Sequence, residues 1–175
     1  TLADLAVLAE AAFALVIRAA ELVGRVERGV ADDHERRVAR GLVPLAKLAT
    51  GKDAVAVASE AIEAFGGAGY VEDTGLPTLL RDAQVLPIWE GTTNVLSLDL
   101  LRAEQRDGAV SALLDDVERL LGAVPAEGAL TPVAATVRTR AQTLRRAVDE
   151  LATAADEVVQ AGMRALALRL GAVTS

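Results

Sequence analysis

The sequence predicts an all-α fold. Of its 175 residues, 52% are apolar but only 2% are aromatic, and a composition rich in alanine and leucine argues against the β-branched and aromatic strands of a sandwich or barrel. Apolar residues also recur in steps of three and four along most of the chain, which is the spacing of an amphipathic helix. The chain is long enough for one domain with a hydrophobic core.

The first helix is expected over residues 2–30, with one charged face and one apolar face. The apolar face should lie against the core and carries Leu2, Leu5, Ala9, Ala12, Val16, Ala19, Val23 and Val26. The run from Leu5 to Ile17 is interrupted by Glu10 and follows Asp4 rather than a basic segment. It therefore predicts neither a signal peptide nor a membrane span.

A second helix is expected after an N-cap at Asp32 or Asp33. Its inner side carries Val38, Leu42, Leu45, Leu48 and Ala49. Pro44 is a position for a kink. Residues 50–53 either end this helix or form a weak spot in one helix that continues to Phe65, and we favour the continuous helix.

The helical pattern stops at residues 66–69, a Gly-Gly-Ala-Gly run. Gly75, Pro77 and Pro87 then predict that the next twenty residues do not form one regular helix. Irregular segments of this kind often carry binding residues, so we expect the functional site here. A helix should resume after residues 91–93 and run toward Arg106.

In the C-terminal third, the sequence predicts a short helix over 111–121, a loop over 122–128, and a long helix that begins at Thr131 and Pro132. In the long helix, one row repeats every seven residues and a second row of mostly small residues accompanies it. This pattern is typical of a seam in a helical bundle. The first row is Val137, Leu144, Leu151, Val158 and Ala165, and the second is Ala141, Val148, Ala155 and Gly162.

Charge and composition exclude several function classes. The formal net charge of -7 makes nucleic acid and anionic membranes unlikely partners. There is no cysteine and only one histidine, His34, so no thiolate or histidine-based metal site is expected. His34 lies among charged residues and is predicted to be at the surface. The lack of cysteine fits a reducing cytoplasm.

The run Phe65-Gly66-Gly67-Ala68-Gly69-Tyr70 has two interpretations. It is either the end of a helix, with Gly66 in a left-handed conformation, or a place where the backbone approaches a phosphate-bearing ligand. It does not match the dinucleotide-binding fingerprint, because no strand precedes it and no helix is expected after it.

The run Trp89-Glu90-Gly91-Thr92-Thr93-Asn94 also has two interpretations. If Trp89 shields Glu90 from water, the carboxylate becomes a useful general base. Otherwise Glu90 only complements a helix N-terminus that Thr92 or Thr93 caps. The neighbouring charges Arg81 and Asp82 are expected to form a solvated or structural pair.

Together, residues 61–102 resemble the C-terminal signature of the acyl-CoA dehydrogenase family, in which GGxGY, RDA and an aromatic-Glu-Gly-Thr motif follow one another at this spacing. The residues of these motifs look closest to those of the adaptive-response branch, which is linked to alkylation damage. The resemblance implies an up-and-down helical bundle over residues 1–106 and a helical extension over 107–175 packed on it. In the family, one further helix with an arginine that contacts FAD precedes the first position of this chain, and the start at Thr1 is expected of a processed or excised chain.

The resemblance implies that Glu90 is the base that removes the α-proton of an acyl-CoA thioester. It also implies that Gly91 abuts the substrate and that Thr92 and Asn94 contact FAD. Three further residues, Phe65, Gly66 and Gly67, would contact the FAD of an adjacent subunit. Glu63 departs from the glutamine that is common in the family and is not expected to contact the cofactor.

The resemblance further implies a homo-oligomer that passes electrons to an electron-transfer acceptor and is inactive as an isolated chain. Two alternatives stay open. The chain is a binding or protective module on a flavoprotein scaffold, or it is a purely structural oligomerising bundle.

Overall fold

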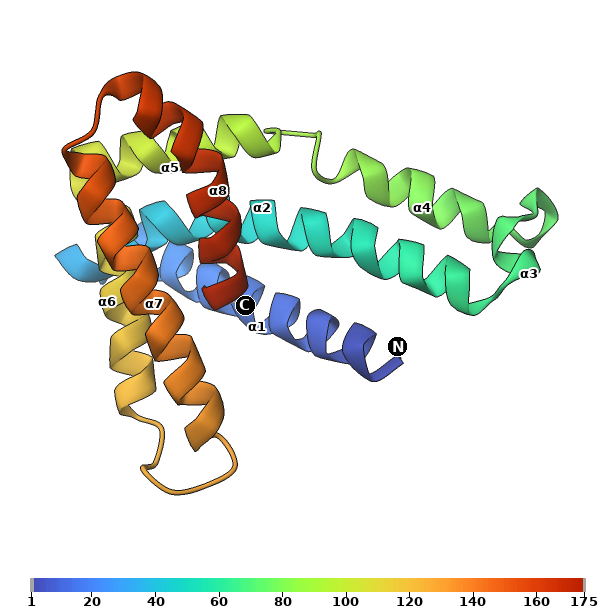
Figure 1. The fold of residues 1–175 in the computed structure, drawn as a ribbon, viewed down its shortest axis with the longest axis horizontal. Coiled ribbons are helices and arrows are strands. Elements are labelled where there is room, and N and C mark those ends of the chain that lie inside the picture. The colour runs from blue at the N-terminus through green and yellow to red at the C-terminus, as the bar shows by residue number, and fades with distance from the viewer. Residues whose placement is uncertain (1, 175) are drawn as a thin grey trace.

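The computed structural model describes residues 2–174, except for the side chain of residue 156, and this part of the chain is all-α, as predicted (Figure 1). Helix α2 is the central element, because α1, α4, α5, α6 and α8 all pack against it. The elements in order are α1 (Leu2–Glu27), α2 (Asp33–Ala64), α3 (Gly67–Tyr70), the 3-10 helix η1 (Glu72–Thr74), α4 (Leu76–Val85), α5 (Thr93–Asp107), α6 (Ala109–Gly122), α7 (Thr131–Ala152) and α8 (Asp156–Thr174).

The long helix α2 confirms the continuous alternative. Asp32 is its N-cap: the Asp32 carboxylate accepts a hydrogen bond from the Glu35 backbone N–H at 2.8 Å, and the Asp32 N–H donates to the Glu35 carboxylate at 3.1 Å. This reciprocal pair satisfies two backbone donors that a helix start leaves free. The helix then runs without interruption through Pro44 and through residues 50–53.

Helix α1 forms where it is expected, but the buried stripe differs from the prediction. Its buried residues are Leu15, Ala19 and Leu22, whereas Val16 is 47% exposed and Val26 is 38% exposed. No residue in the first half of the described helix is buried, so the close contact of α1 with the bundle lies in its second half. Apolar spacing alone could not show where this contact begins.

The segment that begins with the glycine run is more regular than predicted. It contains the single turn α3, the 3-10 turn η1 and the ten-residue helix α4, which returns along α2 (Figure 1). Gly75 has φ of 74° and is the N-cap of α4, and Pro77 lies in the first turn. The glycine and proline that suggested irregular structure instead start a helix, since proline is well tolerated where the backbone N–H has no helical partner.

The single long C-terminal helix is the wrong part of the fold prediction. The chain turns at residues 153–155, and α8 packs back against α7, α5 and α2 (Figure 1). In α7 the seam is right, because Ala141, Leu144 and Val148 are buried. After the turn the register changes: Val158 and Ala165 are exposed, and the buried residues are Val159, Met163, Leu166, Ala167 and Leu170.

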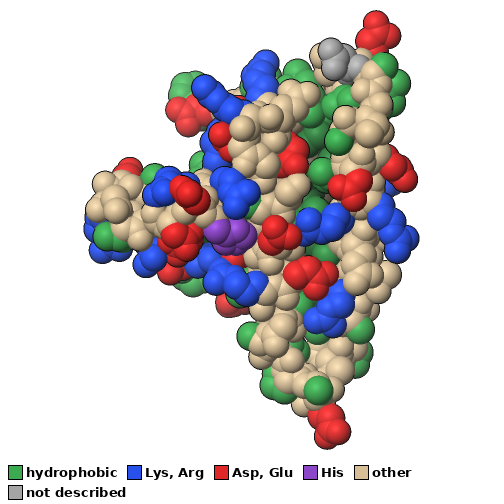
Figure 2. All heavy atoms as spheres, turned by 90° about the vertical axis from the view of Figure 1, so that its left-hand side faces the viewer, with side chains coloured by type: hydrophobic (Ala, Val, Ile, Leu, Met, Phe, Trp, Pro, Cys, Tyr) green, Lys and Arg blue, Asp and Glu red, His purple; other side chains and the backbone are tan. Residues whose placement is uncertain are grey.

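One hydrophobic cluster connects the whole bundle. Its side chains come from α1, α2, α5, α6, α7 and α8, and the fully buried ones include Leu22, Leu45, Leu100, Leu114 and Leu170. The core therefore continues across residues 106 and 107. The division into two domains at this point remains a prediction. On the face shown in Figure 2, acidic and basic side chains are interspersed around the histidine. No helix within residues 2–174 is both long and apolar enough to cross a membrane.

An ion pair joins α2 to α5. Arg40 donates to both oxygens of Asp99, at 2.9 and 2.7 Å, and this contact lowers the pKa of the Asp99 carboxyl below its ordinary value. The pKa of Asp99 is lower in the folded state than in the unfolded state. The ion pair therefore stabilises the fold at pH values above the unfolded-state pKa of about 4, and this stabilisation is lost as pH falls through the folded-state pKa.

We expect Asp99→Asn to lower the free energy of unfolding by about 0.5 kcal/mol at pH 7, as is usual for a partly exposed pair. The difference from the unmutated chain should disappear on acidification below the lowered folded-state pKa of Asp99. Urea unfolding at the two pH values measures it. Asp149→Asn, an exposed carboxylate without an ion pair in the described structure, is the matched control. An Asp99 effect that is the same at both pH values would contradict the prediction.

Candidate active site

Residues 86–92 connect α4 to α5 and carry the predicted catalytic glutamate (Figure 1). A tight turn begins the connection, with the backbone N–H groups of Ile88 and Trp89 both donating to the Val85 carbonyl, at 2.9 and 2.8 Å. The connection lies close to α2 at Gly51. A Cβ there would be 3.4 Å from the backbone of both Leu86 and Pro87. The glycine that suggested a helix break therefore serves close packing.

Glu90 has an unusual backbone conformation. Its φ of 52° is the only positive value at a non-glycine residue among those described, and such a conformation costs roughly 1 kcal/mol or more. Gly91 follows with φ of 126°, and a Cβ there would come within 3.0 Å of the Leu96 side chain. The Glu90 side chain is exposed, and no hydrogen bond or ion pair to the described residues holds it.

The environment of Glu90 corrects two expectations. Trp89 is 68% exposed, so it does not shield the carboxylate within this chain. Thr92 is the N-cap of α5, but its side chain makes no capping hydrogen bond, and Thr93 is buried. The Thr92 hydroxyl and the first backbone N–H groups of α5 are therefore left to solvent or to a ligand.

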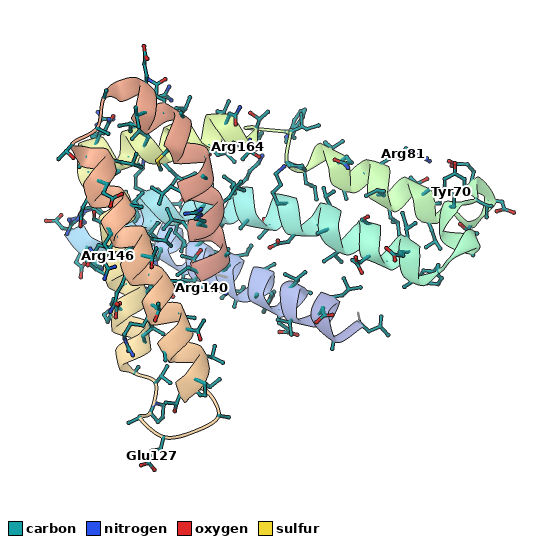
Figure 3. The ribbon with its side chains drawn as sticks, viewed as in Figure 1. Tyr70, Arg81, Glu127, Arg140, Arg146 and Arg164 are labelled. Atoms are coloured by element: carbon teal, nitrogen blue, oxygen red, sulfur yellow. The ribbon has the colours of Figure 1, made fainter. Side chains whose placement is uncertain are left out.

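Two residues that sequence reasoning missed hold this segment from either side. Lys47 of α2 donates to the Gly91 carbonyl at 2.5 Å. Arg164 of α8, which is labelled in Figure 3, donates to the Asn94 side-chain oxygen at 2.6 Å. Lys47 carries a signal in the sequence, because it is a single cation between the apolar residues Ala46 and Leu48. Arg164 carries none, since its partner is 70 positions away.

We expect Lys47→Met to lower the free energy of unfolding by about 1–2 kcal/mol, because it leaves the Gly91 carbonyl without its charged donor. Amide hydrogen exchange in residues 88–92 should become faster. Chemical denaturation and exchange mass spectrometry measure these effects. Lys52→Met, an exposed lysine on the same helix, is the control. Equal effects at the two positions would show that the Lys47 contact does not hold the loop.

The glycine run lies at the other end of α4 from Glu90, at a distance of about 15 Å for ten helical residues. Gly66, two residues after the end of α2, has φ of 57° and ψ of -135°, which is not the left-handed helical conformation that a helix end predicts, and Phe65 is 60% exposed. A Cβ at Gly66 or Gly67 would meet no atom within 4 Å, so this backbone is open to a partner. The predicted cofactor residues therefore form two separate groups.

Other charged candidates have structural roles. Arg81 pairs with Glu72, at 2.9 Å and 3.0 Å, rather than with its neighbour Asp82, and this contact fastens η1 to α4. The pairing lowers the pKa of the Glu72 carboxyl. His34 is half-buried, not fully exposed, and its Nε2 lies 3.9 Å from a carboxylate oxygen of the buried Asp116. Figure 3 shows Arg81 and Tyr70 at the far end of the molecule from Arg146.

Known proteins match both the sequence and the fold. A relative in Caenorhabditis elegans, "Acyl-CoA dehydrogenase family member 11", is 53% identical over 123 residues, which are 70% of this chain and 20% of the relative. "Putative acyl-CoA dehydrogenase AidB" of Escherichia coli is 40% identical over 86 residues, 49% of this chain and 16% of the relative. The likeness is thus not specific to the adaptive-response branch. The chain spans about a fifth of the length of these relatives.

Two solved structures share the fold. The structure of C. elegans ACDH-11 in complex with C11-CoA matches with a TM-score of 0.86 and 40% identity, over 94% of this chain and 28% of that one. An apo-form structure of Bd2924 matches with a TM-score of 0.78 and 40% identity, over 98% of this chain and 30% of that one. The family model "Acyl-CoA dehydrogenase, C-terminal domain" matches residues 1–104. This chain therefore belongs to the acyl-CoA dehydrogenase C-terminal domain family.

Proposed function

We propose that the chain is the C-terminal domain of an FAD-dependent acyl-CoA dehydrogenase-like oxidoreductase, which introduces an α,β double bond into an acyl-CoA thioester. The observation that carries the proposal is the exposed carboxylate of Glu90, which has no hydrogen bond or ion pair among the described residues and lies at a positive φ two residues before the N-cap of α5. Membership of the family and the likeness to an acyl-CoA complex support the substrate class.

In the proposed reaction Glu90 accepts the α-proton of the thioester. This proton is weakly acidic, so the carboxylate must be positioned and shielded from water, and the thioester oxygen needs hydrogen-bond donors. Gly91 is proposed to abut the substrate beside the base. Because Trp89 and Glu90 are exposed in this chain, other parts of the full-length enzyme must cover them, and we expect the isolated chain to be inactive.

The residues at the start of α5 fit FAD. Among the described residues, the Thr92 hydroxyl makes no capping hydrogen bond and the first N–H groups of α5 have no acceptor, and Asn94 is exposed. These donors suit the carbonyl, ribityl and phosphate oxygens of the cofactor. When bound, FAD supplies the acceptor for the hydride that leaves the β-carbon. Electrons then pass to an electron-transfer acceptor.

Phe65, Gly66 and Gly67 are proposed to meet the FAD of an adjacent subunit. Their open backbone and their separation from Thr92 and Asn94 by the length of α4 support this arrangement. It requires a homo-oligomer. The first test is the full-length protein: it should purify with FAD or bind added FAD, and an acyl-CoA should bleach the flavin absorbance under anaerobic conditions. A protein that never binds FAD, or whose flavin no acyl-CoA reduces, would refute the proposed function.

We expect the chain to self-associate, most simply as a symmetric dimer. The seam on α7 is largely covered, so we propose that the interface lies on the outer face of α1, where Val7, Phe13 and Ile17 are 67%, 65% and 53% exposed. Burial of such a patch contributes about 25 cal/mol per Å² toward association. In sedimentation equilibrium at micromolar concentration we expect a mass above 18.1 kDa. Phe13→Asp should shift it toward the monomer, whereas a monomeric unmutated chain would refute the prediction.

A further inference from the structure

The C-terminal extension reaches the candidate cofactor site. Arg164, on α8, donates from Nη1 to Oδ1 of Asn94, in the first turn of α5, at 2.6 Å. In Figure 3 the Arg164 side chain extends toward the end of α5 that adjoins the α4–α5 connection. The family model ends at residue 104, so this contact comes from outside the matched part of the chain.

The backbone on both sides of the contact is fixed by the core. Met163, Leu166 and Ala167, the neighbours of Arg164 on α8, are buried, and α8 packs directly on α5. On the other side, Asn94 lies between the buried residues Thr93 and Leu96. Because both helices are anchored, only side-chain freedom is lost when the hydrogen bond forms, and a bond to a charged donor is stronger than a neutral one.

The contact determines which way the Asn94 amide faces. A guanidinium can only donate hydrogen bonds, so the amide atom toward Arg164 must be the oxygen. The Nδ2 group, with its two N–H donors, is then directed elsewhere. No other hydrogen bond of the Asn94 side chain occurs among the described residues. Asn94 is thereby prepared as a donor for an acceptor-rich ligand.

We propose that Arg164 is a positioning residue that orients Asn94 as an N–H donor toward the flavin, so that the C-terminal extension is part of the cofactor site. The proposal rests on the proposed function, in which Asn94 contacts FAD. It gives residues beyond the matched family domain a specific task in cofactor binding.

The test is a double-mutant cycle in the full-length protein, stripped of flavin and titrated with FAD while flavin fluorescence is recorded. Arg164→Ala and Asn94→Ala should each raise the Kd for FAD about tenfold. The double variant should lose little more than either single variant, because the two residues act as one unit. Arg169→Ala, which removes an exposed cation from the same helix, is the matched control and should leave the Kd unchanged.

Asn94→Asp separates orientation from stability. An aspartate keeps the acceptor for Arg164 but lacks the N–H donors, so the apoprotein should melt no lower than the unmutated one while FAD binding weakens at least tenfold. A merely structural role for Arg164 would lower the melting temperature and leave the Kd and the flavin absorption spectrum unchanged. That result, or losses that multiply in the double variant, would overturn the proposal. If the unmutated protein binds no FAD, the proposed function fails and this inference fails with it.

Discussion

Glu90→Gln is expected to lower the turnover of an acyl-CoA substrate by the full-length enzyme about 10²–10⁴-fold, the usual contribution of a positioned general base. The amide keeps the size of the side chain and does not alter the left-handed backbone at this position, but it cannot accept the α-proton. Since Glu90 has no partner among the described residues, its loss removes no contact that stabilises the bundle. FAD binding and thermal stability should therefore stay close to those of the unmutated protein.

Stopped-flow reduction of the bound flavin under anaerobic conditions measures this effect on the chemical step. Glu60→Gln, an exposed glutamate on α2, is the control and should leave the rate unchanged. A Glu90 variant that reduces its flavin within about twofold of the normal rate would refute the role of the base and favour the structural interpretation of the Trp89–Asn94 run. A variant that loses FAD would show instead that Glu90 supports the cofactor site.

Most helices of this fold could be predicted from the sequence, because local signals determine them. Asp32 and Glu35 form a capping box that starts α2, and the spacing of apolar residues predicts where α1 and α5 run. The break between α7 and α8 could not be predicted in this way. The heptad pattern continues across residues 153–155 in the sequence, but the turn there brings α8 against α5 and α2, and burial by those distant helices outweighs the local pattern.

In the candidate site, too, local motifs could be predicted from the sequence and contacts between distant helices could not. Glu90, Gly91 and Thr92 are recognisable because they are consecutive and belong to a spaced motif. Lys47 and Arg164 hold that segment from helices far away in the sequence, and no pattern within either helix indicates its partner. The exposure of Glu90 was also unpredictable, because shielding by Trp89 depends on the side-chain direction and not on adjacency.

The glycine run contains a residue whose importance the sequence did not indicate. The sequence points to Gly66 and Gly67 as the backbone that a ligand approaches, and in the structure both face open space. Gly69 is the buried one: a Cβ there would lie 2.1 Å from the Ile62 carbonyl oxygen and 2.8 Å from its carbon. This contact joins the single turn α3 to the end of α2. The third glycine is therefore required by close packing and not by a left-handed conformation.

Gly69→Ala is expected to lower the free energy of unfolding by about 3 kcal/mol, at the upper end of the range for an overpacked site. The cost is large because the obstacle is the backbone of a helix, which cannot rotate away as a flexible side chain can. For a chain of this size the melting temperature should fall by about 10 °C. Thermal and urea unfolding of the flavin-free protein measure both quantities.

Gly67→Ala provides the matched control two residues away. A Cβ there meets no atom within 4 Å, and alanine is the better helix former, so stability should be unchanged or slightly higher. If Gly67 contacts FAD as proposed, the same variant should weaken flavin binding, because its methyl group occupies the space of the ligand. The two substitutions should thus have different effects: Gly69→Ala destabilises the apoprotein, and Gly67→Ala impairs only cofactor binding. Equal stability of the two variants would show that α3 can move away from Ile62 at little cost.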